Sequence, residues 1–450
     1  MVVLWTDALI FVLIIVICLL AIYLRNKEHI KRPLQKIGAS KVGVASLVVL
    51  IFFVLIGLVD SLHFKPTEGK STEVMSCLDF WAKPLIEHVE KTYSAPFATT
   101  LYSKELMVLE DGTTKWGYPR LVYGGSHLLN PESDLIPDVS KKVFYSLSQG
   151  IAFGSLPILL YLSIRYKRQS KSVQFVVISS SARTILFAIF VIISLGYTLV
   201  YLSSYYHIFG TDKVGEDVFY QVVKSVRTGL VLGTLTTLIM LPLAIAFGIL
   251  AGFFQGWLDD VIQYLYTTLN SIPGVLLIAA SILMVQVYIA NHEQSFTSVI
   301  VRADMRLLFL CLILGVTNWT GLCRLLRAET LKLREMEYVQ AAHALGVKKA
   351  MILIRHILPN VLHIILISVV LDFSSLVLAE AVLSYINIGV DPTTYSWGNM
   401  INGARLELAR EPIVWWSLTA AFIFMFALVL AANLFADTVQ EAFDPREKAE

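Results

Sequence analysis

The chain has 450 residues, of which 56% are hydrophobic and only 16% are charged, and its formal net charge is +2. Soluble globular domains carry about 25% charged residues, so this composition excludes that class. Several apolar runs exceed the roughly 20 residues that a helix needs to cross a bilayer. The sequence therefore predicts an all-α polytopic membrane protein, and no nucleic-acid partner is expected.

The first 60 residues are predicted to contain two transmembrane helices, Trp5–Leu24 and Val42–Val59. The basic residues between them are Arg25, Lys27, Lys31, Arg32, Lys36 and Lys41. Because Lys and Arg concentrate in cytoplasmic loops, this cluster places the N-terminus on the extracytoplasmic side. Segment 61–142 is then a polar extracytoplasmic loop. It is too long for a simple connection, so we expect it to have structure of its own.

Segment 143–203 is predicted to add two further spans, Val143–Ile164 and Thr184–Leu202. Gly150 and Gly154 reduce the side-chain bulk on one face of the first of them. A second basic cluster between these spans again indicates a cytoplasmic connection. It consists of Arg165, Lys167, Arg168 and Lys171.

Segment 204–446 is predicted to hold five more spans, which brings the total to about nine. They are Val226–Phe254, Tyr264–Ala290, Leu307–Leu322, Val361–Ile388 and Trp416–Asn433. Gly248, Gly252 and Gly256 recur at four-residue spacing, so all three are expected on one helix face that packs closely against a neighbouring helix. Pro273 is expected to break the second of the five spans. The C-terminal tail, 447–450, is expected in the cytoplasm.

Two carboxylates, Asp372 and Glu380, lie inside the apolar run Val361–Ile388. An ionised group that faces lipid costs at least about 2.5 kcal/mol, so both should face the bundle interior, a partner subunit or a water-filled path. The alternatives are a role in lining a translocation path and a buried structural hydrogen bond. For Glu380 the structural role is favoured, because intramembrane acids often tie helices together.

A charged, amphipathic run at 324–360 separates two apolar segments, and its Lys and Arg residues place it in the cytoplasm. Glu337–Leu345 is rich in helix-forming residues, and Ala341, Ala342 and Ala344 leave one face with almost no side-chain bulk. Gly346 is expected to end this helix in a left-handed turn.

A second helix is expected over Lys348–Leu358, because apolar and polar residues alternate there with a helical period. Pro359 is expected to stop it. The pattern thus predicts a helix–glycine–helix unit between two spans. Its alanine face suits docking into a groove of a partner, since small side chains let two backbones approach closely. The alternative is an amphipathic hairpin that lies on the membrane surface.

The residues of this unit resemble a known signature. Gln340-Ala341-Ala342, Gly346 and Ile357-Leu358-Pro359 resemble the EAA loop of ABC-importer permeases, and the surrounding text is similar to the C-type subunit of the dipeptide/oligopeptide branch. The resemblance implies a coupling helix that sits in a cleft of an ATPase subunit. The residues that it implicates are Glu337, Gln340, Ala341, Ala342, Leu345, Gly346, Leu358 and Pro359. The family's usual glutamate is Gln340 here, which removes that carboxylate but leaves coupling by shape.

Other stretches extend the resemblance from His207 to Arg446. HIFGTDKVGEDV, which starts at His207, is similar to the family's HPLGTDxxGRDV, and LAEAVLSYINIG is similar to LAEAxLSFLGLG. The second match includes Glu380, whereas Asp372 has no such support. Ser396–Met400 matches the family's SWGNM.

The resemblance implies a type I ABC-importer permease core in a bacterial inner membrane. The partners that it implies are a second homologous permease subunit, two cytoplasmic ABC ATPase subunits and an extracytoplasmic solute-binding protein. ATP and Mg²⁺ would be handled by the ATPase subunits, while segment Glu337–Gly346 would carry the force. The implied cargo is di- or oligopeptides, or nickel chelates and other small solutes moved by the same machinery.

The sequence contains no catalytic or metal-ligand spacing, so the chain is not expected to be an enzyme or to hold a cofactor. Gly69-Lys70-Ser71-Thr72 matches the end of a phosphate-binding loop, but the position that requires the first glycine is Phe64, so we attribute this match to chance. A function of a different class is a membrane scaffold or sensor whose extracytoplasmic loop binds a ligand. Dependence on an ATPase separates that function from transport.

Overall fold

A computed structural model describes residues 4–24, 28–65, 74–108, 114–168, 179–292 and 298–443. The Gly69–Thr72 match and the tail 447–450 lie outside these ranges. The chain forms two compact units, and three of the borders between them fall inside helices, namely α2 (Glu28–Ala39), α8 (Val218–Phe254) and α16 (Trp416–Phe443), while a fourth lies between Thr394 and Tyr395. The first unit holds 36–228 and 395–431, and the second holds 3–35, 229–394 and 432–450. This division does not test the borders that the sequence predicts for segments 61–142, 143–203 and 204–446, so those borders stay predictions.

Seven helices in the described ranges are long and apolar enough to cross a membrane. They are Lys41–Asp60, Pro131–Arg165, Ser180–Ser203, Val218–Phe254, Gly274–Asn291, Lys349–Tyr385 and Trp416–Phe443. The other two predicted spans fall on α1 (Trp5–Leu24), whose part Trp5–Val16 is a shorter apolar helix, and on the 36-residue α11 (Val299–Arg334). The helical membrane fold is thus confirmed, while the number nine stays a prediction.

The first unit combines membrane helices with a folded loop. Its helices are α3 (Lys41–Asp60), α4 (Cys77–Trp81), α5 (Lys83–Glu87), α6 (Pro131–Arg168), α7 (Ser180–Ser203) and α15 (Trp397–Glu407), with the end of α2 (Glu28–Ala39) and the beginnings of α8 and α16. Its strands form two antiparallel pairs, β1 (His63–Phe64) with β2 (Met75–Ser76) and β3 (Glu105–Val108) with β4 (Thr114–Gly117). The expectation that the loop after α3 has structure of its own is confirmed for its described residues.

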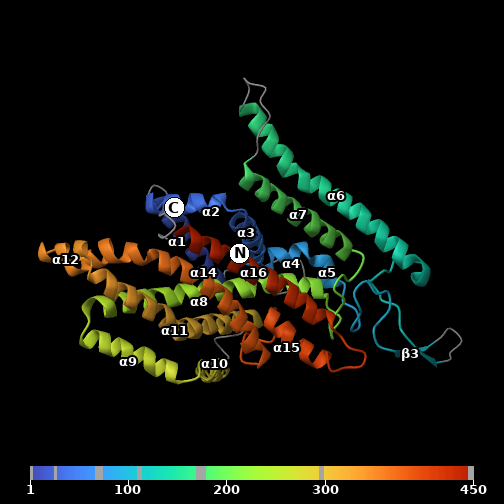
Figure 1. Ribbon diagram of the computed structural model, residues 1–450. Coiled ribbons are helices and arrows are strands. Elements are labelled where there is room, and N and C mark those ends of the chain that lie inside the picture. Colours follow the sequence, from blue (N-terminus) through green and yellow to red (C-terminus); the bar gives the residue numbers. More distant parts are fainter. Residues whose placement is uncertain are drawn as a thin grey trace. The chain divides into compact units, whose positions relative to one another are not determined.

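Helices α6 and α7 run side by side as a hairpin (Figure 1). A Cβ atom on Gly150 would lie 2.7 Å from the carbonyl oxygen of Ser194, and one on Gly154 would lie 3.0 Å from that of Phe190. The Ser194 hydroxyl donates to the Gly150 carbonyl at 3.1 Å. The small face predicted on the first span is therefore the face on which α7 packs, as expected where two backbones approach closely.

The second unit is built around α11 and the later part of α8. Its other helices are α1, α9 (Trp257–Ser271), α10 (Gly274–Asn291), α12 (Glu337–Ala344), α13 (Lys349–Ile352) and α14 (Leu358–Tyr385), with the beginning of α2 and the end of α16. The predicted break at Pro273 is confirmed, because α9 ends at Ser271 and Pro273 caps α10. On α1, both the backbone N–H and the hydroxyl of Thr6 donate to the carboxylate of Asp304 on α11.

Candidate functional site

The loop after α11 forms the predicted helix–glycine–helix unit. Helix α12 ends in a Schellman motif, in which the Val347 N–H donates to the Ala342 carbonyl at 3.1 Å and the Gly346 N–H donates to the His343 carbonyl at 3.0 Å. Gly346 has φ = +74°, the left-handed conformation that glycine adopts without a Cβ penalty. The predicted left-handed end at Gly346 is confirmed.

The two faces of α12 have different surroundings. Val339 and Ala342 are buried, while Gln340, Ala341 and Leu345 are exposed. Leu345 is 83% exposed, so its apolar side chain is available to a partner. The alanine face predicted as one docking surface is thus divided. Ala341 points outward, but Ala342 packs inside the chain and is unavailable to a partner.

The inner face of α12 packs against a buried apolar cluster. Val339 and Ala342 belong to a buried cluster that also contains Phe253 at the end of α8 and Ile352 and Ile357 from the following helical turns. The Arg334 guanidinium donates to the Phe253 carbonyl oxygen at 3.2 Å, and this hydrogen bond links the end of α11 to the end of α8. Because this cluster is packed apolar surface, α12 is expected to move as one body with the helices beneath it.

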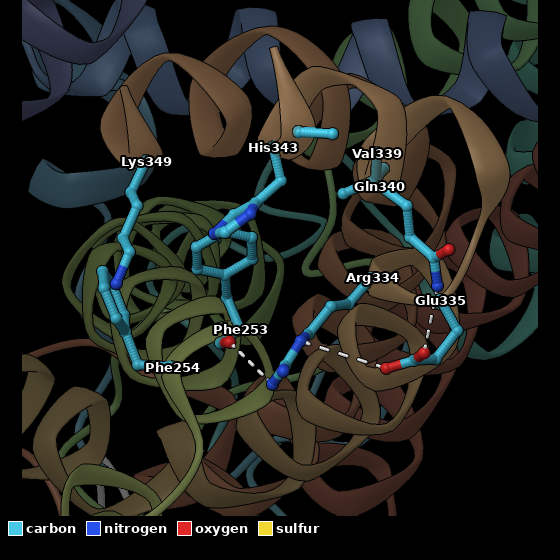
Figure 2. A pocket seen from close by; sticks show the side chains of 9 residues that line it. Phe253, Phe254, Arg334, Glu335, Val339, Gln340, His343 and Lys349 are labelled. Atoms are coloured by element: carbon cyan, nitrogen blue, oxygen red, sulfur yellow. Dashed lines mark hydrogen bonds and ion pairs between the residues drawn. The ribbon is translucent and has the colours of Figure 1, made fainter. Parts of the chain in front are cut away.

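A pocket of about 320 Å³ opens between the ends of α8 and α11 and the helices α12 and α13 (Figure 2). Its charged side chains include Arg334, Glu335 and Lys349, and Lys349 Nζ lies 5.4 Å from the ring centre of Phe254. The Gln340 side-chain amide donates to the Glu335 carboxylate at 3.3 Å. An exposed carboxylate therefore lies beside position 340, although residue 340 itself carries none.

Pro359 does not stop the second helix, so that prediction was wrong. Helix α13 continues through a π-helical turn, Leu353–Ile357, into α14, and Pro359 lies in the first turn of α14. The π-helical turn immediately before Pro359 is the kind of local adjustment by which a continuous helix accommodates a proline and its missing N–H. Leu358 packs against the same buried cluster as Ala342. The loop is thus joined to the next span without an interruption.

Two of the three spaced glycines pack as predicted. A Cβ atom on Gly248 would lie 2.8 Å from the Cys323 carbonyl oxygen, and one on Gly252 would lie 2.7 Å from that of Arg327. Helix α8 therefore touches α11 backbone to backbone. The prediction for Gly256 was wrong: α8 ends at Phe254, and Gly256, with φ = +61° and nothing within 4 Å of its Cβ position, belongs to the turn that starts α9.

Sequence reasoning missed the ion pair that holds this turn. Arg327 Nε lies 2.6 Å from Asp259 Oδ1 and Nη2 lies 2.7 Å from Oδ2, a bidentate pair between α11 and α9. The Arg327 guanidinium lowers the pKa of the Asp259 carboxyl, and desolvation opposes it. An acidic residue in the first turn of α9 was the available signal, but nothing local identifies its partner.

The two intramembrane carboxylates of α14 differ in their surroundings. Glu380 is buried and accepts a hydrogen bond from the hydroxyl of Ser384, one turn further along the same helix, at 2.7 Å, and its favoured role in tying helices together stays a prediction. Asp372 is half-buried, and within the described ranges no hydrogen bond or ion pair reaches its carboxylate. A translocation-path role for Asp372 stays a prediction.

A second feature missed by sequence reasoning lies at the HIFGTDKVGEDV stretch. His207 is buried between two carboxylates, with Nδ1 2.7 Å from Asp217 Oδ2 and Nε2 3.5 Å from Glu90 Oε1. Glu90 also accepts from the backbone N–H groups of Val122–Gly124 at 2.8–3.0 Å. A Cβ atom on Gly215, which has φ = +82°, would fall 1.8 Å from the Glu90 carbonyl oxygen. These glycine and carboxylate positions serve to hold the folded loop after α3.

This cluster predicts a loss of local stability at alkaline pH. Burial disfavours the imidazolium, but the hydrogen bonds to Asp217 and Glu90 outweigh it and raise the pKa of His207 to about 9. Since the folded value exceeds the ordinary 6.5, the stabilisation is complete below pH 6.5 and is lost as pH rises through 9. We expect the protection of the Val122–Gly124 amides to fall by more than about tenfold between pH 7 and pH 10.

Hydrogen exchange, corrected for the intrinsic pH dependence of the rate, measures this change. Burial raises the pKa of Glu90, but the hydrogen bonds from the His207 imidazole and three backbone N–H groups outweigh it and lower the pKa to about 2. The stabilisation that ionised Glu90 contributes is therefore lost only near pH 2, far below the pH range of this experiment. The variant His207→Gln should show low protection at both pH values. Equal protection of the wild type at pH 7 and pH 10 would contradict the assignment of a charged His207.

Comparison with known proteins adds a further observation. A family model for the inner membrane component of binding-protein-dependent transport systems matches residues 244–449, a range that includes the helix–glycine–helix unit. The dipeptide transport system permease protein of Lactococcus lactis subsp. cremoris is 31% identical over 240 residues, which cover 53% of this chain and 64% of that protein. The glutathione transport system permease protein of Pectobacterium atrosepticum is 29% identical over 245 residues, which cover 54% and 74% of the two chains. A Brucella suis biovar 1 protein provisionally named a peptide permease is 31% identical over 245 residues, with the same two shares.

Proposed function

The chain belongs to the family of inner membrane components of binding-protein-dependent transport systems, and from this premise we propose that it is the permease subunit of an ATP-driven importer for di- or oligopeptides. It would act as a multi-pass protein of a bacterial inner membrane, with its N-terminus outside and its C-terminus inside. The partners in this proposal are a second permease, two ATPase subunits and an extracytoplasmic solute-binding protein.

The observation that carries the proposal is the combination of an exposed Leu345 with a rigid support. Leu345 lies in the Schellman turn that Gly346 closes, at the end of the helix whose Val339 and Ala342 belong to the packed cluster. An apolar side chain held in this way costs little further conformational entropy when it enters a partner's cleft. The same support connects the turn to α8, α11 and α14, so displacement of the turn reaches the membrane helices.

The mechanism then needs no phosphate-binding residues in this chain. ATP and Mg²⁺ would bind to the separate ATPase subunits, whose closure would move α12 as a rigid body. The backbone contact of Gly248 and Gly252 with α11 would carry this motion along α8. Peptide cargo is supported by the printed names of similar proteins, and a nickel-chelate or other small-solute cargo remains the alternative within the same machinery.

The proposal is tested by purifying the chain from its native membrane in mild detergent. We expect a second permease and ATPase subunits to co-purify, and peptide-loaded solute-binding protein to raise the ATPase rate of the reconstituted complex. Stimulation by another class of solute, with no effect of peptides, would contradict the proposed peptide substrate but would support the ATP-driven importer. Absence of an ATPase from the purified material would instead favour the scaffold or sensor function.

A further inference from the structure

The antiparallel pair β3–β4 is a small sheet with little cover. Its register places Leu106 opposite Trp116 and Met107 opposite Lys115, and among the residues that the structure describes this sheet has two strands. Isolated two-stranded hairpins are marginally stable in water, and both edges of such a sheet present unpaired backbone groups. The hairpin therefore has the properties of a surface that another protein covers.

One face of this hairpin is apolar and exposed. Leu106 is 54% exposed, Trp116 is 66% exposed and Tyr118, two residues further on, is 51% exposed. Because side chains alternate along a strand, Leu106 and its cross-strand neighbour Trp116 lie on the same face. Lys104 Nζ lies 5.6 Å from the Tyr118 ring centre, which adds a cation at the base of this face. We call Leu106, Trp116 and Tyr118 the hairpin face.

The base of the hairpin is firmly held. The Leu101 N–H donates to the Pro119 carbonyl at 2.8 Å, and both Leu101 and Leu121 are buried. The Tyr102 hydroxyl donates to the Ile413 carbonyl at 3.0 Å, and its ring packs edge-on against Trp416 at the start of α16. Through Tyr102, a displacement of the hairpin caused by a bound protein would therefore be transmitted to the connection between α15 and α16.

Lipid is a poor candidate for covering the hairpin face. Open sheet edges do not occur in the hydrocarbon region of a bilayer, because their N–H and C=O groups would lose hydrogen bonds. Glu105 on β3 forms an exposed ion pair with Lys91, and Lys115 on β4 is exposed as well, so the hairpin is flanked by hydrated charges. The occupant is better matched by a folded, water-soluble protein.

We propose that the hairpin face is the docking surface for the extracytoplasmic solute-binding protein. This inference rests on the proposed function and on the predicted extracytoplasmic position of the loop after α3. The family to which the chain belongs is described by its dependence on a binding protein, and the proposed function places that partner on the extracytoplasmic side. Trp116, the largest exposed aromatic of the hairpin face, would be the anchor, as central aromatic residues are in many interfaces.

The first experiment places a photo-crosslinking residue on the hairpin face in living cells. Leu106→p-benzoylphenylalanine should form a crosslink to a solute-binding protein, which mass spectrometry identifies. The same residue at Trp81, which is 80% exposed on α4, provides the matched control and should not form that crosslink. Crosslinks from position 106 that reach only lipid, the second permease or another copy of this chain would overturn the proposal.

The second experiment uses the crosslinked binding protein after purification. It measures the concentration that half-maximally stimulates the ATPase of the complete complex in nanodiscs. We expect Trp116→Ala to raise this concentration at least about tenfold, since truncation of an interface anchor costs more than about 1.4 kcal/mol. Trp81→Ala should match the wild type. Elution profile and thermal midpoint check that each variant is folded.

The outcomes separate the two proposals. An unchanged half-maximal concentration in Trp116→Ala, with a responsive wild-type complex, overturns the docking surface and leaves the importer function intact. A wild-type complex that contains no ATPase, or that responds to no binding protein, overturns the importer function and the docking surface together.

Discussion

A permease that carries Leu345→Asp should insert and fold like the wild type but fail to retain its ATPase subunits. Leu345 is 83% exposed and supports nothing inside the chain, so its replacement costs little folding energy. In the assembled importer its side chain would be buried, and burial of a leucine contributes about 1.5–3 kcal/mol. Loss of this contribution lowers the affinity about 10- to 100-fold, and an unpaired buried carboxylate lowers it further.

Co-purification of the ATPase and substrate-stimulated ATPase activity measure this effect. Val214→Asp is the matched control, because Val214 is also exposed and apolar but lies in the predicted extracytoplasmic stretch after His207. We expect the control to retain the ATPase. Normal retention by Leu345→Asp would show that the turn at Gly346 does not enter a partner.

Ala342→Trp gives a different result for a different reason. Ala342 belongs to the buried cluster beneath α12, so a larger side chain there overpacks the chain's own interior. Loss of transport in that variant would report on folding and would not identify a docking surface. Leu345 is therefore the residue that tests docking, although the sequence pattern alone favours the alanines.

Gly252→Ala on α8 should destabilise the folded permease, although alanine is the better helix former. The added Cβ would lie 2.6 Å from Thr330 Cβ and 2.7 Å from the Arg327 carbonyl oxygen, and the second of these is backbone that cannot rotate away. Overpacking of this kind typically costs about 1–3 kcal/mol. The contact of α8 with α11 would widen, and the support beneath α12 would loosen with it.

The midpoint of unfolding in sodium dodecyl sulfate or on heating measures this loss. Gly321→Ala on α11 is the same substitution in the same unit, but its Cβ would meet nothing within 4 Å. There we expect no loss, because alanine improves helix propensity by up to about 1 kcal/mol over glycine. If Gly252→Ala proved as stable as Gly321→Ala, backbone contact between the two helices would not hold them together.

The structure also changes what Gln340 implies. The family's usual glutamate is absent at 340, yet Glu335 accepts a hydrogen bond from the Gln340 amide. The loop therefore still presents a carboxylate at this place, supplied by the residue that caps α11. A pattern match compares positions one by one, so it registers the missing glutamate and not the neighbouring one.

The sequence by itself determined the features that depend on residues a few positions apart. Apolar runs identified the membrane helices, Gly346 identified the end of α12, and Pro273 identified the break between α9 and α10. These predictions succeed because helix length, left-handed φ values and the missing proline N–H are properties of the local chain.

Only the tertiary structure decided which side of each element faces the interior. It turned Ala342 inward and Leu345 outward, and it removed Gly256 from the packing face. It also brought together Asp259 and Arg327, which are 68 residues apart in the chain. Such pairs form because separate helices pack against one another, and no periodicity within one helix specifies which distant residue it will meet.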